Sequence, residues 1–297
     1  MKPRGRLLVV ATPLGNLADI TARASEALRG CDLVACEDTR RTRVLLAHLG
    51  VTARALSYHK FNEASRLDPI LGALAEGKTV ALVTDAGTPG ISDPGARLVS
   101  AARSAGAGVE AIPGPSAPAA AVSVSGFESP GYLFAGYPPP RGAARRRFLA
   151  GLRAAEAARA SADPGAEPLP LVFFEAPHRI EACLDDLRAE LGDRRAVLIR
   201  EMTKLHEETL SGSLSGIAAA LRDAPRRGEF TIVVEGRSEP EIREVRTPSE
   251  IREAYRGLLA SGVDRREALR MLARSTGVSR RDLYKVIAGH GTEAGEG

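Results

Sequence analysis

The sequence contains no tryptophan and few other aromatic residues, and its three cysteines, Cys31, Cys36 and Cys183, do not have metal-ligand spacing. Because an odd number of cysteines cannot all pair within one chain, we interpret them as small buried apolar side chains. No stretch approaches the roughly 18 uncharged apolar residues of a membrane-spanning helix. The apolar run after Arg6 is also too short for a signal peptide. These absences predict a cytoplasmic protein that makes no contact with a membrane.

Two common nucleotide-binding signatures are also missing. No Gly-x-Gly-x-x-Gly follows the first predicted strand, and the chain has no Walker lysine motif. This argues against dinucleotide redox chemistry and against P-loop hydrolysis of nucleoside triphosphates. Glu37 and Asp38 could supply the ribose-binding carboxylate of a dinucleotide fold, but that interpretation is weak without the glycine fingerprint.

Positive charge is concentrated in two parts of the chain, although the net charge is only +4. Residues 242–285 hold eleven Arg or Lys against six Asp or Glu, a local net charge of +5. A second cluster, including Arg141, Arg145, Arg146 and Arg147, follows a run of three prolines. Such local fields suit a polyanionic partner. A solvated helix face is the more common explanation for any single cluster of this kind.

The first part of the chain alternates between short apolar strands and amphipathic helices. The predicted strands are 7–11, 33–36, 80–83 and 109–112, and the predicted helices are 19–28, 39–49, 63–75, 94–105 and one opening after residue 115. This alternation predicts an α/β domain over residues 1–125, with a mostly parallel sheet covered on both faces.

A second α/β domain with a more mixed sheet is predicted for residues 126–240. Its predicted strands are 132–135, 171–174, 196–199, 206–210 and 230–234, with helices near 145–152, 179–191 and 213–221. Residues 157–170 are rich in Ala, Pro and Gly without a period, so we expect a flexible surface insertion there.

The C-terminal region, residues 241–297, is predicted to be helical. Helices at 249–259, 264–274 and 279–287 surround a turn through Gly277 and Val278, and Ser279 with Asp282 resembles a capping box. This spacing resembles a helix-turn-helix, which would bind nucleic acid. A three-helix cap without any such function relies on the same physics, so both interpretations stay open.

Polar loops follow several of the predicted strands, at residues 12–16, 37–40, 84–95 and 113–116. Carboxyl ends of parallel strands meet at one edge, so these loops should line one crevice. Loops 175–179 and 200–204 of the second domain occupy equivalent positions, which predicts a cleft between the two domains. In loop 84–95, glycines and prolines indicate a rigid binding loop, with a helix beginning near Pro94. The alternative is an ordinary connection in which Asp93 caps that helix.

Seven motifs occur in an order and spacing that point to one enzyme family. They are Thr12-Pro-Leu-Gly-Asn-Leu, Glu37-Asp-Thr-Arg40, Val83-Thr-Asp-Ala-Gly-Thr-Pro-Gly-Ile-Ser-Asp-Pro-Gly95, Pro113-Gly-Pro-Ser116, Phe174-Glu-Ala-Pro-His-Arg179, Arg200-Glu-Met-Thr-Lys204 and Gly228-Glu-Phe-Thr-Ile-Val-Val-Glu235. Together they resemble the small-subunit ribosomal RNA methyltransferases of the tetrapyrrole methylase superfamily, which act on ribose 2′-hydroxyls. The resemblance covers residues 6–236 nearly continuously.

The resemblance implies S-adenosylmethionine as methyl donor in the interdomain cleft, no metal, and a homodimer. It implies a decoding-centre cytidine of 16S rRNA as target, in naked RNA or in the assembled small subunit. The implied cofactor-binding residues are Pro13, Asp85, Ala86, Gly87, Ile91, Ser116, Ala117 and Phe174. The chemistry agrees, since glycine-turn backbone groups can bind the methionine part and an aspartate favours a cationic donor.

Methyl transfer to a ribose hydroxyl benefits from a base or from a cation that stabilises the developing alkoxide. Candidates are Asp38, Asp93, His59 and Lys204, and spacing does not choose between them. We favour Asp38, with Arg40 orienting it or gripping a phosphate, and include Lys204 in the catalytic set. The alternative for residues 37–40 is a helix cap with a first-turn ion pair.

The two basic regions are the predicted RNA-binding surfaces. Their candidate residues are Arg141, Arg145, Arg146, Arg147, Arg280, Arg281 and Lys285. Two rival functions remain: a methylase of a tetrapyrrole or a protein side chain within the same superfamily, and a nucleic-acid-binding regulator that acts through the C-terminal helices. The extended basic regions count against a small acidic ring as the substrate.

Overall fold

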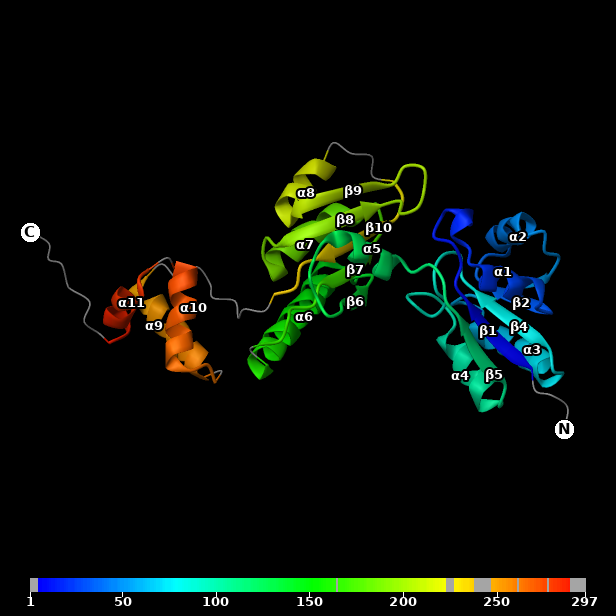
Figure 1. The fold of residues 1–297 in the computed structure, drawn as a ribbon, viewed down its shortest axis with the longest axis horizontal. Helices are drawn as coiled ribbons and strands as arrows, with labels where there is room; N and C mark the ends of the chain where they lie inside the picture. The colour runs from blue at the N-terminus through cyan, green and yellow to red at the C-terminus, as the bar shows by residue number, and fades with distance from the viewer. Residues whose placement is uncertain are drawn as a thin grey trace, which may run out of the picture.

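The computed structural model describes residues 5–163, 165–222, 227–237, 247–260, 262–276 and 278–288. Figure 1 shows two α/β domains next to each other and a third unit made of helices. The predicted fold class is therefore confirmed. No helix within these ranges is long and apolar enough to cross a membrane.

The first domain is built on a five-stranded parallel sheet in the order β3-β2-β4-β1-β5. Its strands are β1 (Arg6–Val10), β2 (Leu33–Cys36), β3 (Arg54–Ser57), β4 (Thr79–Val83) and β5 (Gly108–Ile112). The prediction omitted β3, an edge strand in which Arg54 is exposed and no side chain is fully buried. Because all five strands are parallel, their carboxyl ends form one edge, and the candidate site lies there.

Alternate residues of these strands face opposite helix layers. On one side, Leu8 and Val10 of β1 pack with α1 (Ala22–Arg29) and α2 (Thr39–His48). On the other side, Leu7 packs with α3 (Glu63–Ala75) and α4 (Ala96–Ser104). Burial of both faces explains why the sequence of these strands shows near-continuous apolar runs. Before α1, the short 3-10 helix η1 (Leu17–Asp19) replaces the start of the helix predicted at residue 19.

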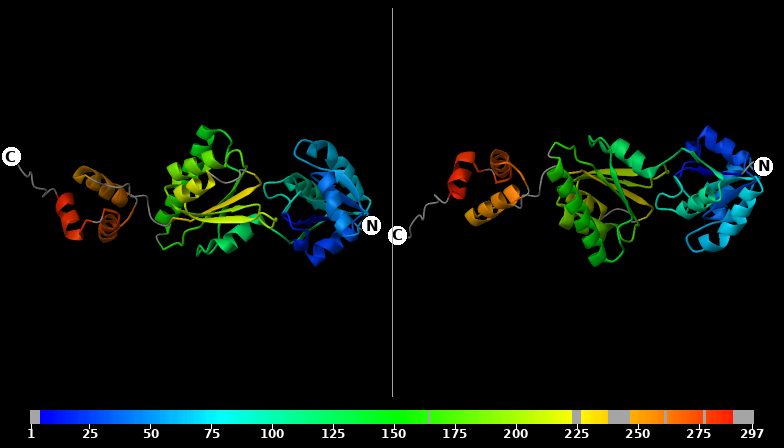
Figure 2. Two further views of the ribbon diagram at one scale, coloured as in Figure 1. Left: turned by 90° about the horizontal axis from the view of Figure 1, so that it is seen from above. Right: turned by 90° about the horizontal axis from the view of Figure 1, so that it is seen from below.

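The second domain has a mixed sheet in the order β6-β7-β10-β8-β9, in which only β6 and β7 pair in parallel. Its strands are β6 (Leu133–Gly136), β7 (Leu171–Glu175), β8 (Arg195–Arg200), β9 (Glu208–Ser213) and β10 (Phe230–Val234). Figure 2 shows helices on both sides of this sheet. One face is covered by α6 (Gly142–Ala162), α7 (Ile180–Leu191) and α8 (Leu214–Leu221).

The other face is covered by α5 (Ala117–Ser125), which follows the last strand of the first sheet. Ala121 of α5 is fully buried against Val172, Val197 and Val233 of the second sheet. The predicted boundary after residue 125 therefore assigns α5 to the first domain, whereas its packing joins it to the second.

Two predicted segments differ from the structure. Residues 157–162 were expected in a flexible insertion, but they continue α6, because Ala and Arg are strong helix formers even without an apolar period. Beyond the helix, Ser129 Oγ donates to the carbonyl of Pro168 at 2.9 Å, so this connection is held against the domain. Helix α4 was expected from Pro94 but begins at Ala96, since Gly95 has a φ of +143° outside the helical region.

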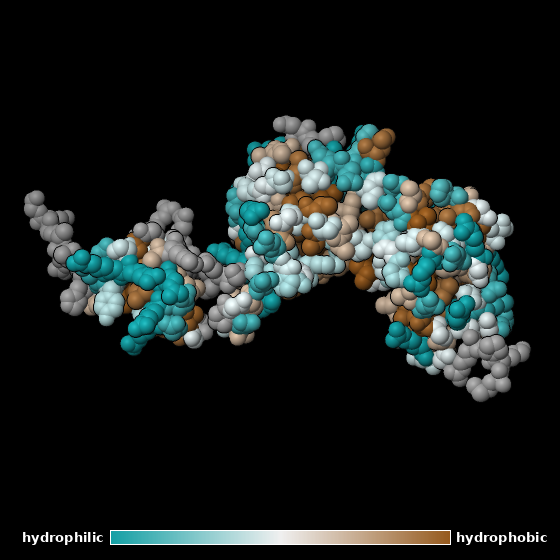
Figure 3. Space-filling model, in the orientation of Figure 1, coloured by the Kyte–Doolittle hydropathy of each residue, from teal (hydrophilic) through white to brown (hydrophobic). Residues whose placement is uncertain are grey.

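The three C-terminal helices, α9 (Pro248–Ala260), α10 (Arg265–Thr276) and α11 (Arg280–Ile287), match the predicted helices closely. They share their own core, which includes Ile251, Leu272 and Leu283. Ser279 caps α11 as predicted, because its hydroxyl accepts a hydrogen bond from the Asp282 amide at 3.2 Å. Gly277 lies outside the described residues. The visible surface of this unit is largely hydrophilic (Figure 3).

Candidate active site

The polar loops at the carboxyl edge of the first sheet are tied together by hydrogen bonds. Thr12, after β1, and Gly87, after β4, form a two-way backbone bridge of 2.9 and 3.0 Å. The Asp38 amide donates to Asp85 Oδ1 at 3.1 Å, and Thr88 Oγ1 donates to the carbonyl of Pro115 at 3.2 Å. These contacts confirm that the four loops converge, as the sheet topology predicts.

The loop after β4 adopts backbone conformations that depend on its special residues. Gly87 and Gly90 have φ values of +77° and +83°, which residues with a Cβ rarely adopt. Ser92 has a φ of +63° without being glycine, a strained conformation of the kind found at functional sites. The loop is therefore strained immediately before Asp93, at the carboxyl edge of the sheet.

Two adjoining cavities open at the junction of the two α/β domains. The larger cavity, of about 400 Å³, is lined by Pro13, Leu14, Val44 and Lys204, among others. The smaller cavity, of about 260 Å³, is lined by residues that include Ile91, Asp93, Ala117, Tyr137, Phe174 and Met202. Leu14, Arg41, Asp85, Ala86 and Glu229 line both. The predicted interdomain cleft is thus present as two adjoining cavities that share lining residues.

The smaller cavity is rich in carboxyl groups. Burial, reinforced by the charges of Glu37, Asp85 and Glu229, raises the pKa of Asp93 to about 7. Burial also raises the pKa of Glu37, and the neighbouring Asp85 adds to this shift. Asp93 does not cap α4, whose N-cap position is Gly95. Its carboxyl group is therefore not engaged in capping, and the surrounding negative field favours a positively charged ligand.

Asp38 has a different environment. It is the N-cap of α2, where Oδ1 accepts the Arg40 amide at 2.8 Å. The Arg40 guanidinium also grips both carboxylate oxygens, at 3.1 and 2.8 Å. The hydrogen bonds from Arg40 lower the pKa of Asp38 to about 2. This is the helix cap and ion pair that the sequence left as the alternative, and neither residue lines the cavities.

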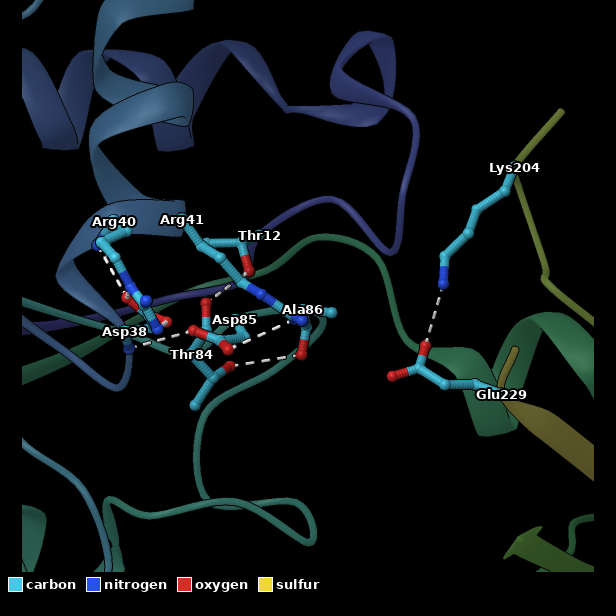
Figure 4. A network of polar contacts seen from close by, with 9 residues as sticks. All are labelled: Thr12, Asp38, Arg40, Arg41, Thr84, Asp85, Ala86, Lys204 and Glu229. Atoms are coloured by element: carbon cyan, nitrogen blue, oxygen red, sulfur yellow. Dashed lines mark hydrogen bonds and ion pairs between the residues drawn. The ribbon is translucent and has the colours of Figure 1, made fainter. Parts of the chain in front are cut away.

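Lys204 follows β8 in the second domain, and its side chain extends towards Glu229 (Figure 4). Its Nζ contacts Glu201 Oε1 at 2.9 Å and Glu229 Oε2 at 3.2 Å. Burial alone would lower the pKa of Lys204, but the hydrogen bonds to these carboxylates raise it above its ordinary value. Glu201 and Thr203 have φ values of +52° and +66°, so the loop carrying Lys204 is itself strained.

Phe174 lies at the end of β7 in a small aromatic cluster. Its ring centroid is 4.9 Å from that of Phe134 and 5.5 Å from that of Tyr137. The next residue, Glu175, is buried, pairs with Arg179 and accepts the Ala176 amide at 2.8 Å. This buried ion pair fixes the end of β7 and the position of the aromatic wall of the smaller cavity.

The structure brings most of the predicted cofactor-binding residues together. Those that line the smaller cavity are Asp85, Ala86, Ile91, Ala117 and Phe174, while Pro13 lines the larger one. Gly87 contributes through its backbone bridge to Thr12, and Ser116 is the N-cap residue of α5. Their role in binding a cofactor remains a prediction.

The predicted RNA-binding residues are not all available at the surface. Arg145 is only 5% exposed, and its Nε donates to Asp186 Oδ2 at 2.7 Å while Nη2 donates to the carbonyl of Ala182. This corrects its assignment, because the guanidinium is enclosed between α6 and α7. Arg141, Arg146 and Arg147 are exposed, as are Arg280, Arg281 and Lys285.

Several residues that line the cavities have no predicted role, above all Arg41, Tyr137 and Glu229. Arg41 Nη1 lies 3.3 Å from Asp85 Oδ2. Two signals were present in the sequence: Tyr137 lies two residues beyond the strand predicted at 132–135, and Arg41 adjoins Arg40 of the Glu37-Asp-Thr-Arg40 motif. The motif does not show which of the two neighbouring arginines, Arg40 or Arg41, turns towards the cavities.

Comparison with known proteins defines the class to which this arrangement belongs. The family model for tetrapyrrole (corrin/porphyrin) methylases matches residues 6–218. Cobalt precorrin-4 methyltransferase, a cobalamin biosynthetic enzyme, has a similar fold, with a TM-score of 0.57 over 77% of this chain and 94% of that chain at 17% identity. The chain therefore belongs to the tetrapyrrole methylase family.

Within that family, the sequence is similar to proteins named ribosomal RNA small subunit methyltransferase I. The protein of that name from Synechocystis sp. is 40% identical over 283 residues, covering 95% of this chain and 97% of its own length. The one from Thermotoga maritima is 43% identical over 233 residues, covering 78% of this chain and 99% of its own length. A segment of this chain thus has no counterpart in the Thermotoga protein.

Proposed function

We propose that this protein is an S-adenosylmethionine-dependent methyltransferase that modifies the ribose 2′-hydroxyl of a cytidine in the decoding centre of 16S rRNA. The observation that carries the proposal is the pair of adjoining cavities, which share Asp85 and Ala86 at their junction. A group transfer needs two ligands held side by side in a fixed orientation. The names of the relatives and the seven motifs support ribosomal RNA as the acceptor.

The residues of the smaller cavity fit S-adenosylmethionine. Its carboxyl groups, from Glu37, Asp85 and Asp93, suit a donor that carries a positive sulfonium and an ammonium group. Phe174 and Tyr137 supply an apolar wall for an adenine ring. When bound, the donor supplies an electrophilic methyl group on sulfur.

The larger cavity would then accept the target nucleotide. It is lined by Leu14, Val44 and Lys204 and adjoins the smaller cavity, with which it shares lining residues. Lys204 is a cation at this position, suited to stabilise negative charge that develops on the attacking oxygen. The strained loop that carries it holds its side chain between two carboxylates.

Asp93 is better suited than Asp38 to accept the hydroxyl proton. A general base works best when its pKa lies near the working pH, and burial raises the pKa of Asp93 to about 7. The Asp38 carboxylate, with a pKa of about 2 and both oxygens held by Arg40, is a poor proton acceptor. We propose Asp93 as the base, reached by a 2′-hydroxyl that extends from the larger cavity past the shared residues Asp85 and Ala86 into the smaller cavity, which Asp93 lines. Asp38 and Arg40 fix the start of α2.

RNA contact is proposed through the exposed arginines at the start of α6 and the basic face of α11. Arg141, Arg146 and Arg147 serve in the first, and Arg280, Arg281 and Lys285 in the second. A homodimer and a cytoplasmic location are part of the same proposal.

The decisive experiment is incubation of the full-length protein with methyl-labelled S-adenosylmethionine and either 16S rRNA or small ribosomal subunits. Alkaline hydrolysis cannot cleave next to a 2′-O-methylated ribose, so the label should remain in a dinucleotide. A parallel reaction with a porphyrin acceptor tests the chemistry suggested by the family name. Label in the porphyrin and none in any RNA or subunit preparation would refute the proposal.

A further inference from the structure

Helix α2 begins with positive charges at the end of the helix that disfavours them. Arg40, Arg41 and Arg43 lie among its first five residues, and its first turn has no acidic residue. The N-terminus of a helix carries a partial positive charge, so cations there are unfavourable. Proteins depart from this preference for acidic residues at a helix N-terminus mainly at functional sites.

Of these three arginines, Arg41 faces the candidate site. It lines both cavities, whereas Arg40 and Arg43 are not among the lining residues. The Arg40 guanidinium is engaged by Asp38. Arg41 contacts Asp85 Oδ2 through one terminal nitrogen, at 3.3 Å, and its side chain is 67% exposed (Figure 4).

Asp85 holds Arg41 at this junction. Its other oxygen, Oδ1, accepts the Asp38 amide at 3.1 Å, so the carboxylate is anchored to the backbone at the start of α2. A guanidinium has five N–H donors in a rigid fork, and the contact with Asp85 engages one terminal nitrogen. The fork can therefore bind an anion while the side chain stays tethered.

We propose that Arg41 binds the backbone phosphate next to the target ribose and thereby positions the 2′-hydroxyl. The inference rests on the proposed function. In RNA, the 3′-phosphate is attached to the carbon adjacent to the one that bears the 2′-hydroxyl, so a group that grips this phosphate also fixes the nucleophile. Arg forms paired hydrogen bonds to phosphate, which adds orientation to charge.

Two other roles for Arg41 would have different consequences. It could orient Asp85 for donor binding, or it could bind the carboxylate of the donor itself, since it also lines the smaller cavity. Either role predicts a loss of affinity for S-adenosylmethionine. The phosphate role predicts a loss of affinity for RNA with donor affinity retained.

The test uses three variants of the full-length protein: Arg41→Ala, Arg41→Lys and a control, Arg23→Ala. Arg23 is comparably exposed and also paired with a carboxylate, Glu110, at 3.1 Å, but it lies on α1 and lines neither cavity. Donor affinity is measured by calorimetry with S-adenosylmethionine. RNA affinity is measured by filter binding over a series of KCl concentrations, and KM and kcat are measured with the RNA or subunit preparation that the wild-type protein methylates.

Arg41→Ala should raise the RNA KM by about tenfold, since one lost charge-assisted contact costs that order. Its slope of log affinity against log salt should become shallower by about 0.7 to 0.9, the value for one phosphate contact. Arg41→Lys should keep the wild-type slope and recover only part of kcat/KM, because it restores charge without the fork. Donor affinity should stay within about twofold in both, and Arg23→Ala should match the wild type.

Reduced donor affinity with unchanged RNA KM and salt slope in Arg41→Ala would overturn the inference and assign Arg41 to the donor. Wild-type behaviour of Arg41→Ala in every measurement would overturn it as well. Failure of the wild-type protein to methylate any RNA preparation would instead refute the proposed function, a result visible before any variant is made.

Discussion

Gly15 and Lys204 meet where the two α/β domains approach each other. A Cβ atom on Gly15 would lie 2.4 Å from Lys204 Cγ and 2.9 Å from Cε, distances that real Cβ atoms do not tolerate. The contact lies at the larger cavity, which both residues line. The Lys204 side chain therefore occupies the space that a side chain at position 15 would need.

Gly15→Ala should displace Lys204 and weaken methyl transfer, since a shift of about 1 Å near an active site can cost on the order of 100-fold. The measurement is kcat/KM with RNA, together with thermal unfolding. Gly72→Ala is the control, because nothing lies within 4 Å of its added Cβ in α3. That change should leave activity intact and stabilise the helix by about 0.5 to 1 kcal/mol. If steric conflict is the cause, adding Lys204→Ala to Gly15→Ala should cost less than the two changes separately.

The assignment of the base predicts different effects of two isosteric changes. Asp93→Asn should lower kcat by about 100-fold or more, the range attributed to general-base catalysis. Asp38→Asn should retain most activity, because asparagine also caps helices well. Single-turnover rates at saturating donor and RNA compare the variants directly. The opposite ranking would restore Asp38, the residue favoured by the sequence, as the base.

Rates should also depend on pH through Asp93. In the free protein kcat/KM should rise as the pH approaches about 7 and then level off, because the carboxylate form accepts the proton. A bound cationic donor favours that form, so the midpoint of the kcat profile should lie at lower pH. A common midpoint for both profiles, or one that Asp93→Asn retains, would contradict this assignment.

Stability should respond to pH in the opposite sense. The folded pKa of Asp93, about 7, lies above its ordinary value of 3.8, so its contribution to stability is complete below about pH 4 and is lost as the pH rises to 7. Asp93→Asn stays neutral and should gain free energy of unfolding relative to the wild type over that range. Urea denaturation at several pH values measures this difference.

Alanine substitutions at Arg145 and Arg147 should distinguish a structural arginine of α6 from an RNA-binding one. Arg145→Ala leaves Asp186 largely buried without its main partner and should lower the free energy of unfolding by about 3 kcal/mol. Arg147 is exposed, so Arg147→Ala should leave stability unchanged while weakening RNA binding. Urea denaturation and filter binding report the two effects. Equal stability of both variants would contradict the structural role of Arg145.

A chain ending at residue 237 should retain donor affinity and kcat but show a higher KM for RNA. The match to the Thermotoga relative spans 78% of this chain and 99% of that protein's length, so that relative lacks a segment of comparable size. The helices α9 to α11 also have their own core. Circular dichroism checks that the shortened chain is folded. A fall in kcat with KM unchanged would place these helices in the catalytic step.

The sequence was most informative for strands buried on both faces. β2 and β10 were predicted with their full bounds because continuous apolar runs identify central strands. β3 was missed because an edge strand with Arg54 exposed has no such run. The convergence of the loops after the strands of the first sheet could be predicted from the parallel arrangement of the strands alone.

The roles of individual side chains depended on backbone details that the sequence does not display. Asp38 and Asp93 both precede helices, but only Asp38 is an N-cap residue. The conformation of Gly95, which is the N-cap of α4, leaves Asp93 outside the capping position. Arg145 looked like part of a basic surface. Its spacing of four from the buried Leu149 was the available sign that it faces α7.

The packing of α5 determines where this protein can be divided into two complementing fragments. A cut after residue 125 would leave α5 on the first fragment and expose the apolar face that Val172, Val197 and Val233 present to Ala121. A cut between β5 and α5 leaves each sheet with the helices that pack on it. The cut falls in the loop whose Pro115 carbonyl accepts a hydrogen bond from Thr88. A split reporter of donor binding should therefore be divided before α5, with its two halves rejoined by the ligand between them.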